Sequence, residues 1–150
     1  MTQPRSERDA YYVAIDLLSR REHSRVELES KLANKGFPEE QIAQAMVQLL
    51  ENDLQSDQRY LEDFVRSRLL KGSGPLKIAH ELRQRGIAES ELHSYLESQH
   101  IDWLEVATAT YQKKYRQEEE IEPRERAKRV RFMQSKGFPS DIIFQLFDKK

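Results

Sequence analysis

The feature that most constrains the fold of this chain is a segment that occurs three times. The three copies align on Gly36, Gly86 and Gly137, which are 50 and 51 residues apart. In each copy a large apolar residue stands four positions before the glycine and a cation directly before it, and apolar residues follow one, six and ten positions after it. Internal periodicity of this kind is typical of tandem-repeat proteins, in which each copy is one supersecondary unit. These positions are filled by Leu32, Lys35, Phe37, Ile42 and Met46, by Leu82, Arg85, Ile87, Leu92 and Leu96, and by Met133, Lys136, Phe138, Ile143 and Phe147.

Each of these glycines has the properties of a corner between two helices. Glycine adopts the left-handed conformation that closes a helix at little steric cost, and a cation before it interacts favourably with the negative end of the helix dipole. Pro38 and Pro139 suit the first turn of the following helix, where no amide donor is needed. We therefore expect a helix-turn-helix corner in every repeat.

Every repeat also has room for an earlier helix. Ser24 and Glu27 form the capping-box pattern that starts a helix, and apolar residues recur at helical spacing on both sides of it. No stretch alternates convincingly enough to be a strand. The sequence thus predicts an all-α protein of three tandem three-helix repeats, at 1–55, 56–100 and 101–150. Because each unit is small, stacking of neighbouring repeats should form an elongated, curved array. The charged stretch 117–122 is expected to be a loop or a frayed helix end. The expected apolar stripes comprise Tyr11, Ala14, Ile15 and Leu18; Ile42, Ala45, Met46, Leu49 and Leu50; Leu61, Phe64 and Val65; Ile78, Ala79 and Leu82; Leu92, Tyr95 and Leu96; and Leu104, Ala107 and Tyr111.

Composition and motifs argue against catalysis. The chain has no Cys, which excludes disulfides and thiol chemistry and fits a reducing cytoplasm. His80 is followed by Glu81, but position 84 is Gln, so the zinc-protease pattern H-E-x-x-H fails at its second ligand. The loop Lys71–Pro75 lacks the G-K-[ST] ending of a phosphate-binding loop and follows no strand, so we interpret it as a connection between helices. No catalytic residue, metal site or cofactor is expected, and the four histidines are expected to be solvent-facing helical residues.

Two further patterns have a structural interpretation. Tyr111 and Tyr115 are four residues apart and could stack on bases, but their spacing favours a core stripe, and Trp103 is expected in the core or between repeats. No apolar run approaches the roughly 20 residues that span a bilayer. The first eight residues contain no signal-peptide core, so we expect a cytoplasmic protein without a membrane partner.

Charge is strongly segregated along the chain, although the net charge is only −1. Residues 64–87 carry six cations and one anion, and residues 124–136 again carry six cations and one anion. By contrast, residues 36–56 and 88–106 contain four and five anions and neither Lys nor Arg. Cationic faces indicate a partner with a phosphate backbone or with an acidic protein surface. The alternative interpretation is that ordinary solvated faces differ by accident.

Several motifs in the chain are similar to one known family. The first repeat contains YYVAIDLLSRREHSRVELESKLANKGF, the second contains FVRSR and GPLKIAHELRQRGI, and the third ends on RFMQSKGF. Together these segments resemble the RecX family of bacterial recombination regulators, over essentially the whole chain. The resemblance implies three tandem three-helix repeats, no enzymatic activity and no cofactor.

The resemblance also implies partners and a function. It implies binding to RecA recombinase filaments on single-stranded DNA, restraint of their ATP hydrolysis and strand exchange, and thereby control of homologous recombination and DNA repair. Double-stranded DNA is a further candidate partner, whereas a small-molecule substrate is not expected. The alternatives are a stand-alone helical DNA-binding protein, against which the acidic helices after the first two corners argue, and a neutral scaffold.

The candidate contact residues are the cations within the matching motifs, although some of them, such as Arg85, could simply close a helix. They are Arg20, Arg21, Arg25, Arg66, Arg68, Lys71, Lys77, Arg83, Arg85, Arg126, Lys128, Arg129 and Arg131.

Overall fold

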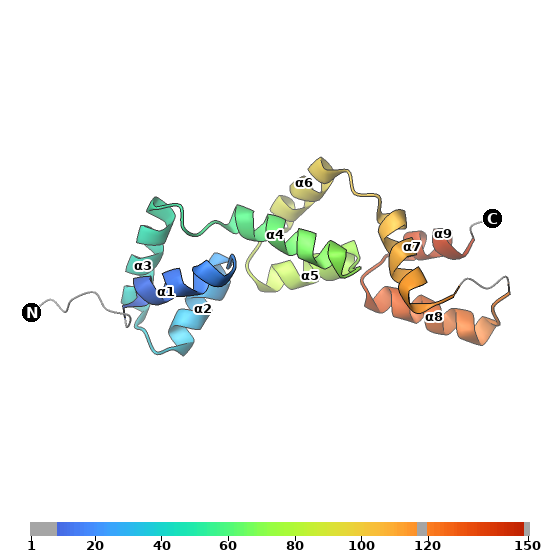
Figure 1. The fold of residues 1–150 in the computed structure, drawn as a ribbon, viewed down its shortest axis with the longest axis horizontal. Coiled ribbons are helices and arrows are strands. Elements are labelled where there is room, and N and C mark those ends of the chain that lie inside the picture. Colours follow the sequence, from blue (N-terminus) through green and yellow to red (C-terminus); the bar gives the residue numbers. More distant parts are fainter. Residues whose placement is uncertain (1–8, 117–119, 149–150) are drawn as a thin grey trace, which may run out of the picture. The chain divides into compact units, whose positions relative to one another are not determined.

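The computed structural model describes residues 9–116 and 120–148, and in this part of the chain nine helices follow one another without a strand (Figure 1). The prediction of an all-α fold with three helices in each of three repeats is confirmed. The first repeat holds α1 (Ala10–Arg20), α2 (Arg25–Asn34) and α3 (Glu39–Glu51). The second holds α4 (Asp57–Leu70), α5 (Pro75–Gln84) and α6 (Glu89–Gln99). The third holds α7 (Trp103–Lys114), α8 (Pro123–Ser135) and α9 (Ser140–Phe147).

Packing divides the chain into two compact units that cut across the second repeat. One unit runs to Asp63 and includes Gln84–Ala88, and the other holds Phe64–Arg83 and the residues from Glu89 onward. The border therefore falls inside α4 and again at the corner between α5 and α6. The repeat limits 1–55, 56–100 and 101–150, and the curvature of the array, stay predictions.

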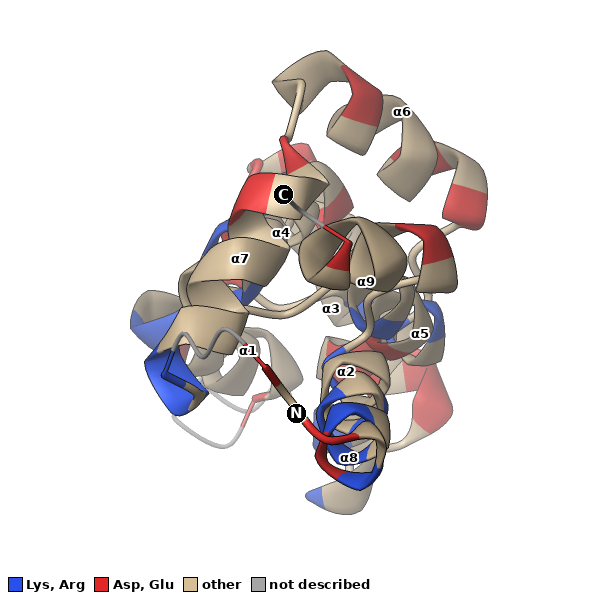
Figure 2. Cartoon of the chain, turned by 90° about the vertical axis from the view of Figure 1, so that its right-hand side faces the viewer, with Lys and Arg blue, Asp and Glu red and all other residues tan. Residues whose placement is uncertain are grey.

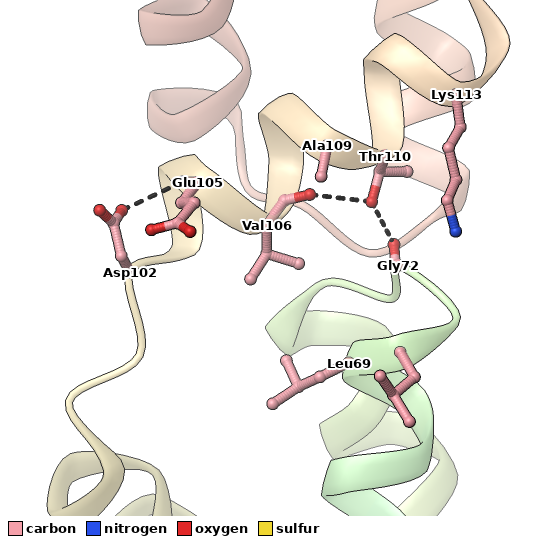
Figure 3. A pocket seen from close by; sticks show the side chains of 9 residues that line it. Leu69, Gly72, Asp102, Glu105, Val106, Ala109, Thr110 and Lys113 are labelled. Atoms are coloured by element: carbon pink, nitrogen blue, oxygen red, sulfur yellow. Dashed lines mark hydrogen bonds between the residues drawn. The ribbon is translucent and has the colours of Figure 1, made fainter.

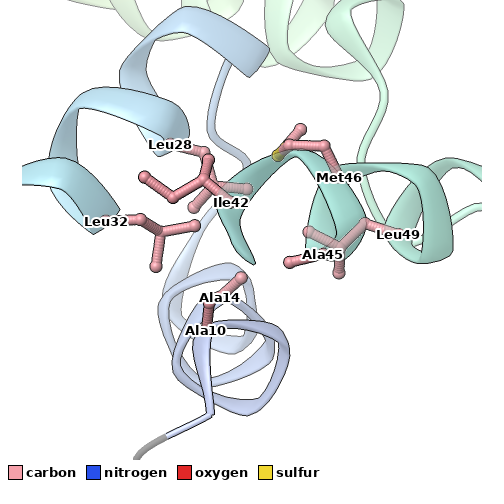
Figure 4. Close-up of a cluster of buried hydrophobic side chains, with 8 residues drawn as sticks. All are labelled: Ala10, Ala14, Leu28, Leu32, Ile42, Ala45, Met46 and Leu49. Carbon is pink, nitrogen blue, oxygen red and sulfur yellow. The ribbon is translucent and has the colours of Figure 1, made fainter. Parts of the chain in front are cut away.

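The core of the first unit lies between the three helices of the first repeat (Figure 4). Its eight buried residues are Ala10, Ala14, Leu28, Leu32, Ile42, Ala45, Met46 and Leu49. The two alanines let α1 approach the larger side chains of α2 and α3 closely, and each fully buried Leu, Ile or Met contributes roughly 1.5–3 kcal/mol. Leu50 was predicted on the same stripe, but it is 46% exposed, because it is turned away from the face that carries Met46 and Leu49.

The helix-end chemistry follows the sequence closely. The Ser24 hydroxyl accepts a hydrogen bond from the Glu27 amide at 3.1 Å, and the Glu27 carboxylate accepts one from the Ser24 amide at 3.4 Å, so the predicted capping box is present. Pro38 and Pro139 precede their helices as N-caps instead of lying in the first turn. Their extended ψ angles, 149° and 162°, explain this one-residue difference.

All three corner glycines adopt the expected left-handed conformation, with φ of 94° at Gly36, 81° at Gly86 and 99° at Gly137. In the first repeat the amide of Phe37 donates to the carbonyl of Leu32 at 3.2 Å, which satisfies a carbonyl at the helix end. The apolar residue after the glycine is thereby directed back onto its helix.

The core of the second unit gathers around the third repeat. Ala107, Met133, Phe138 and Ile143 are buried there, and Trp103, Tyr111 and other apolar side chains pack against them. The Tyr115 ring lies 5.1 Å from that of Tyr111 and 5.7 Å from that of Phe132. The core interpretation of Trp103 and Tyr111 is confirmed, whereas Tyr115 is half-buried and lies beyond the end of α7 as its C-cap.

Within this second unit, the Lys71–Pro75 loop packs on the corner of the third repeat. The Gly74 amide donates to the carbonyl of Lys136 at 2.7 Å, and the Leu76 amide donates to that of Gly137 at 2.9 Å. A Cβ at Gly74 would stand 2.4 Å from the Gly137 carbonyl oxygen, so only glycine permits this approach. The loop interpretation of Lys71–Pro75 is confirmed, and its contact with the third repeat determines where the nearby cations lie.

Among the described residues, no helix combines the length and the apolar character that crossing a bilayer requires. The charged stretch predicted at 117–122 lies partly outside the described residues; from 120 to 122 it has no regular secondary structure.

Candidate nucleic-acid interface

Four lysines that lie in or directly after four different helices meet around the Lys71–Pro75 loop of the second unit. Lys71 follows the end of α4, Lys77 lies on α5, Lys113 is in the last turn of α7, and Lys136 caps α8. The Lys136 ammonium donates to the carbonyl oxygen of Lys71 at 3.4 Å. Lys77 packs so closely on the third-repeat corner that a Cβ at Gly137 would lie 2.4 Å from its own Cβ. We call these four residues the lysine cluster.

Two charges of the lysine cluster act on a third. The pKa of Lys136 is lowered, first by its partial burial and then by the positive charges of Lys77 and Lys113. In the part of the chain that the structure describes, no carboxylate lies within ion-pair distance of any of the four ammonium groups. Such a concentration of unbalanced positive charge attracts a polyanion.

The backbone of the loop itself is not arranged to bind phosphate. Its amides are already used: Gly72 donates to Leu69 at 3.0 Å, Ser73 to Arg68 at 3.0 Å, and Gly74 to Lys136 at 2.7 Å. Pro75 has no amide hydrogen. The lysine side chains, and not a nest of amides, are therefore the groups that could hold an anion here.

The predicted arginines of the first repeat are each paired with a nearby carboxylate. Arg20 ends α1, Arg21 is its C-cap, and Arg25 begins α2. Arg20 lies 3.1 Å from Asp16, Arg21 lies 2.6 Å from Glu27, and Arg25 lies 3.3 Å from Glu29. The hydrogen bond to Glu27 is the main cause that raises the pKa of Arg21. Exposed ion pairs contribute only about 0–1 kcal/mol, so these arginines could exchange partners, but each would first lose one.

Three predicted cations serve the fold of the second unit. Arg68 pairs with Glu81 at 3.3 Å and its guanidinium lies 4.2 Å from the centre of the Phe64 ring. Arg129 is only 5% exposed. Its guanidinium donates to Glu125 and to the Tyr111 hydroxyl, both at 2.8 Å, which raises its pKa.

Arg126 lies 3.5 Å from Asp148, with its guanidinium 5.1 Å from the centre of the Phe147 ring. Like Arg68 and Arg129, it therefore anchors one helix to another within the unit. Arg68, Arg126 and Arg129 are therefore not part of the candidate interface.

The other predicted cations are at the surface but do not join the lysine cluster in any contact that the structure shows. Arg66, Arg83, Lys128 and Arg131 are exposed, on α4, α5 and α8. Arg85, in the first unit, is half-buried and lies near Tyr60, whose pKa is raised chiefly by burial.

Two members of the lysine cluster, Lys113 and Lys136, were not among the candidate contact residues predicted from the sequence. Lys136 appeared there only as the cation before a corner glycine, and Lys113 was not singled out. The signal that could have found Lys136 was its place in the repeat, because the equivalent Arg85 was selected. Lys113 could be found only from the three-dimensional packing of α7 beside the loop.

The prediction of solvent-facing helical histidines is wrong for two of the four residues, because His100 lies in a turn after the end of α6, with φ of 50°, and His23 is buried. His80, His93 and His100 are exposed, but His23 is only 2% exposed and lies between helices. Its Nδ1 is 3.1 Å from the carbonyl oxygen of Arg21, and its Nε2 is 3.0 Å from the Lys31 ammonium. This pattern fits a neutral ring that donates from Nδ1 and accepts at Nε2. No group of three metal-ligating side chains occurs among the described residues.

The charge segregation seen in the sequence is maintained on individual helices (Figure 2). Figure 2 shows acidic residues along α6, which has neither Lys nor Arg, whereas α8 carries many cations. Because α6 follows the corner at Gly86 and is acidic, it is poorly suited to enter a groove of DNA as a recognition helix.

The chain matches family models for all three repeats. Residues 10–49 match the first three-helix domain of RecX, residues 56–92 the second, and residues 101–147 the third.

Curated relatives and solved structures agree with these matches. The chain is 42% identical to the regulatory protein RecX of Pseudomonas putida (strain GB-1), over 89% of this chain and 85% of that one. It is 44% identical to the regulatory protein RecX of Ectopseudomonas mendocina (strain ymp), over 89% of each. A crystal structure of RecX from Lactobacillus salivarius covers 93% of both chains at a TM-score of 0.76 and 25% identity. A second crystal structure, of regulatory protein RecX, matches 93% of this chain and 72% of its own at a TM-score of 0.79 and 28% identity.

Proposed function

Because the chain belongs to the RecX family of regulatory proteins, we propose that it binds RecA recombinase filaments on single-stranded DNA and inhibits their ATP hydrolysis and strand exchange. It thereby moderates homologous recombination and DNA repair, and acts in the cytoplasm, where such filaments form. It acts by binding and not by catalysis, and it uses no cofactor.

The observation that carries this proposal is the lysine cluster. Its four lysines lie in or directly after four different helices, yet no carboxylate of the described residues pairs with their ammonium groups. Lysine is a compact point charge suited to phosphate oxygens. We assign the cluster to the phosphate backbone of the DNA strand in the filament.

Salt dependence tests this assignment quantitatively. Each phosphate that a protein neutralises on a single strand changes the logarithm of the binding constant by about −0.7 per decade of salt. Four lysine contacts would therefore contribute a slope of roughly −3. We expect replacement of all four lysines by Gln to reduce the slope by about that amount and to weaken binding at least tenfold at low salt.

A matched control is present in the first repeat. Lys35 stands directly before Gly36, as Lys136 stands before Gly137, and it is exposed. Lys35→Gln should leave the salt slope unchanged, whereas Lys136→Gln should reduce it by about 0.7. Equal slopes for the two variants would overturn the assignment of the cluster.

The inhibition itself is tested by titrating this protein into RecA filaments on single-stranded DNA and following ATP hydrolysis. Inhibition well below one molecule per recombinase subunit, unrelieved by excess DNA, is the expected result. Inhibition that excess DNA relieves would favour the stand-alone DNA-binding alternative. No inhibition by folded protein would contradict the proposed function.

A further inference from the structure

A pocket of about 340 Å³ adjoins the lysine cluster within the second unit, between the end of α4 and α7 (Figure 3). Its apolar lining comes from Leu69 and Leu70 on α4 and from Val106 and Ala109 on α7. Leu70 is 77% exposed, so the fold makes almost no use of this large side chain. Solitary exposed leucines are ordinary, but this one forms the rim of a concavity with further apolar walls.

The pocket is held open by the structure around it. The Thr110 hydroxyl lies 2.9 Å from the carbonyl oxygens of both Gly72 and Val106, and it can donate its single hydrogen to either of them. A Cβ at Gly72 would come within 2.5 Å of that hydroxyl. The loop after α4 and the middle of α7 therefore keep a fixed spacing, and a ligand would enter a site that is already formed.

The two ends of the pocket carry opposite charge. Asp102 and Glu105 lie together at one end, and Lys113 lies at the other (Figure 3). One oxygen of Asp102 accepts a hydrogen bond from the Glu105 amide at 3.1 Å. The Glu105 carboxylate has no ion pair within the described residues. Both carboxylates would repel a phosphate backbone, so the pocket differs in kind from the lysine cluster beside it.

We infer that this pocket receives an apolar anchor residue from a partner protein, with a Lys or Arg next to that anchor placed against Asp102 and Glu105. Protein interfaces concentrate their binding energy on a few side chains that fill such pockets. Complementary charge at the rim selects the partner and its direction. Lys113 belongs to both sites, so the protein segment and the phosphate backbone would lie side by side. The inference rests on the proposed function, in which the partner protein is the recombinase filament.

The test uses two variants of the pocket and one control. Leu70→Ser removes the apolar rim, and Glu105→Lys reverses the charge at the acidic end; both side chains are exposed. Leu76→Ser is the control, because Leu76 is a leucine of the same unit that is 58% exposed and does not line the pocket. Each variant is measured for binding to RecA filaments on single-stranded DNA, for binding to bare single-stranded DNA, and for thermal unfolding.

The expected result is a loss of filament affinity of at least tenfold for Leu70→Ser and Glu105→Lys, and of less than twofold for Leu76→Ser. Leu70→Ser should bind bare DNA as the unaltered protein does. Unchanged filament binding by Leu70→Ser overturns the inference alone. An equal loss on filament and bare DNA overturns the assignment to a protein. If Leu70→Ser fails to fold, Glu105→Lys decides: its new positive charge favours contact with DNA, so a filament affinity that does not fall overturns the inference. If the unaltered protein does not bind filaments, the proposed function fails, and the inference fails with it.

Discussion

Gly36 and Gly137 occupy the same corner in the first and third repeats, yet alanine should be far more costly at one than at the other. Both have a positive φ, 94° and 99°, and the left-handed conformation costs an alanine roughly 1–2 kcal/mol. The stiffer unfolded chain offsets about 0.4–1 kcal/mol of that cost. Backbone strain alone therefore predicts a loss of about 1 kcal/mol for either substitution.

The space around each glycine separates the two sites. An alanine Cβ at position 36 would have no atom of another part of the chain within 4 Å. An alanine Cβ at position 137 would lie 2.4 Å from the Cβ and 2.6 Å from the amide nitrogen of Lys77. Because the second contact is with the backbone of α5, it cannot be relieved by a side-chain rotation. Overpacking of this kind adds roughly 1–3 kcal/mol, so we expect about 1 kcal/mol for Gly36→Ala and about 2–4 kcal/mol for Gly137→Ala.

Thermal unfolding measures the difference. For a chain of this size 1 kcal/mol corresponds to about 2–4 °C, so Gly36→Ala should lower the midpoint by about 3 °C and Gly137→Ala by about 10 °C. Circular dichroism follows all helices, while the single Trp, Trp103, packs in the unit of Gly137 and reports on that unit. Equal shifts for the two variants would show that α5 does not pack on this corner, and would refute the geometry of the lysine cluster as well.

Three further predictions test separate contacts by substitution. Gly86→Ala would place a Cβ 2.3 Å from Cγ2 of Val26. The loss of unfolding free energy that it causes, measured in urea, should therefore be about 1 kcal/mol smaller in a Val26→Ala background. Additive losses in the double variant would contradict the contact. Burial lowers the pKa of His23 from 6.5, so the unfolded state binds more protons below about pH 6.5; the unfolding free energy should fall as the pH drops from about 6.5. His23→Gln should flatten that dependence, and an unchanged pH profile would exclude His23 as its cause. Arg129→Lys should destabilise the protein by about 1–2 kcal/mol, because the guanidinium's paired hydrogen bonds are lost. Lys128→Gln, at an exposed position, is the control and should cost less than about 0.5 kcal/mol. Equal denaturation midpoints for the two variants would show that Arg129 is not structural.

Features that depend on neighbours in the sequence could be predicted from it. The capping box at Ser24 and the left-handed glycines follow from backbone hydrogen bonding within a few residues. The buried positions of α2 and α3 follow from helical periodicity. Leu50 departs from the expectation because α3 is apolar over more than one face, and the sequence contains nothing that tells which of these faces meets the core.

The candidate site could not be predicted in the same way, because it depends on residues far apart in the chain. Lys71 and Lys136 are 65 positions apart, and they meet only because Gly74 allows the loop to reach the third corner. Charge counting cannot separate an arginine such as Arg129, which packs in a core, from a lysine at the surface. Nor does it show that His23 has two polar partners that compensate its burial.

The structure also gives a physical reason why the lysine cluster tolerates its own repulsion. Lys71, Lys113 and Lys136 all stand at helix C-termini, where the helix dipole amounts to roughly half a negative charge. Three converging dipoles thus take the place of carboxylates, and they leave the ammonium groups able to meet phosphates without first breaking an ion pair. Arg20, Arg21 and similar cations must give up a carboxylate to make the same contact. The cluster, although smaller than the full set of cations, should therefore dominate the electrostatic part of binding.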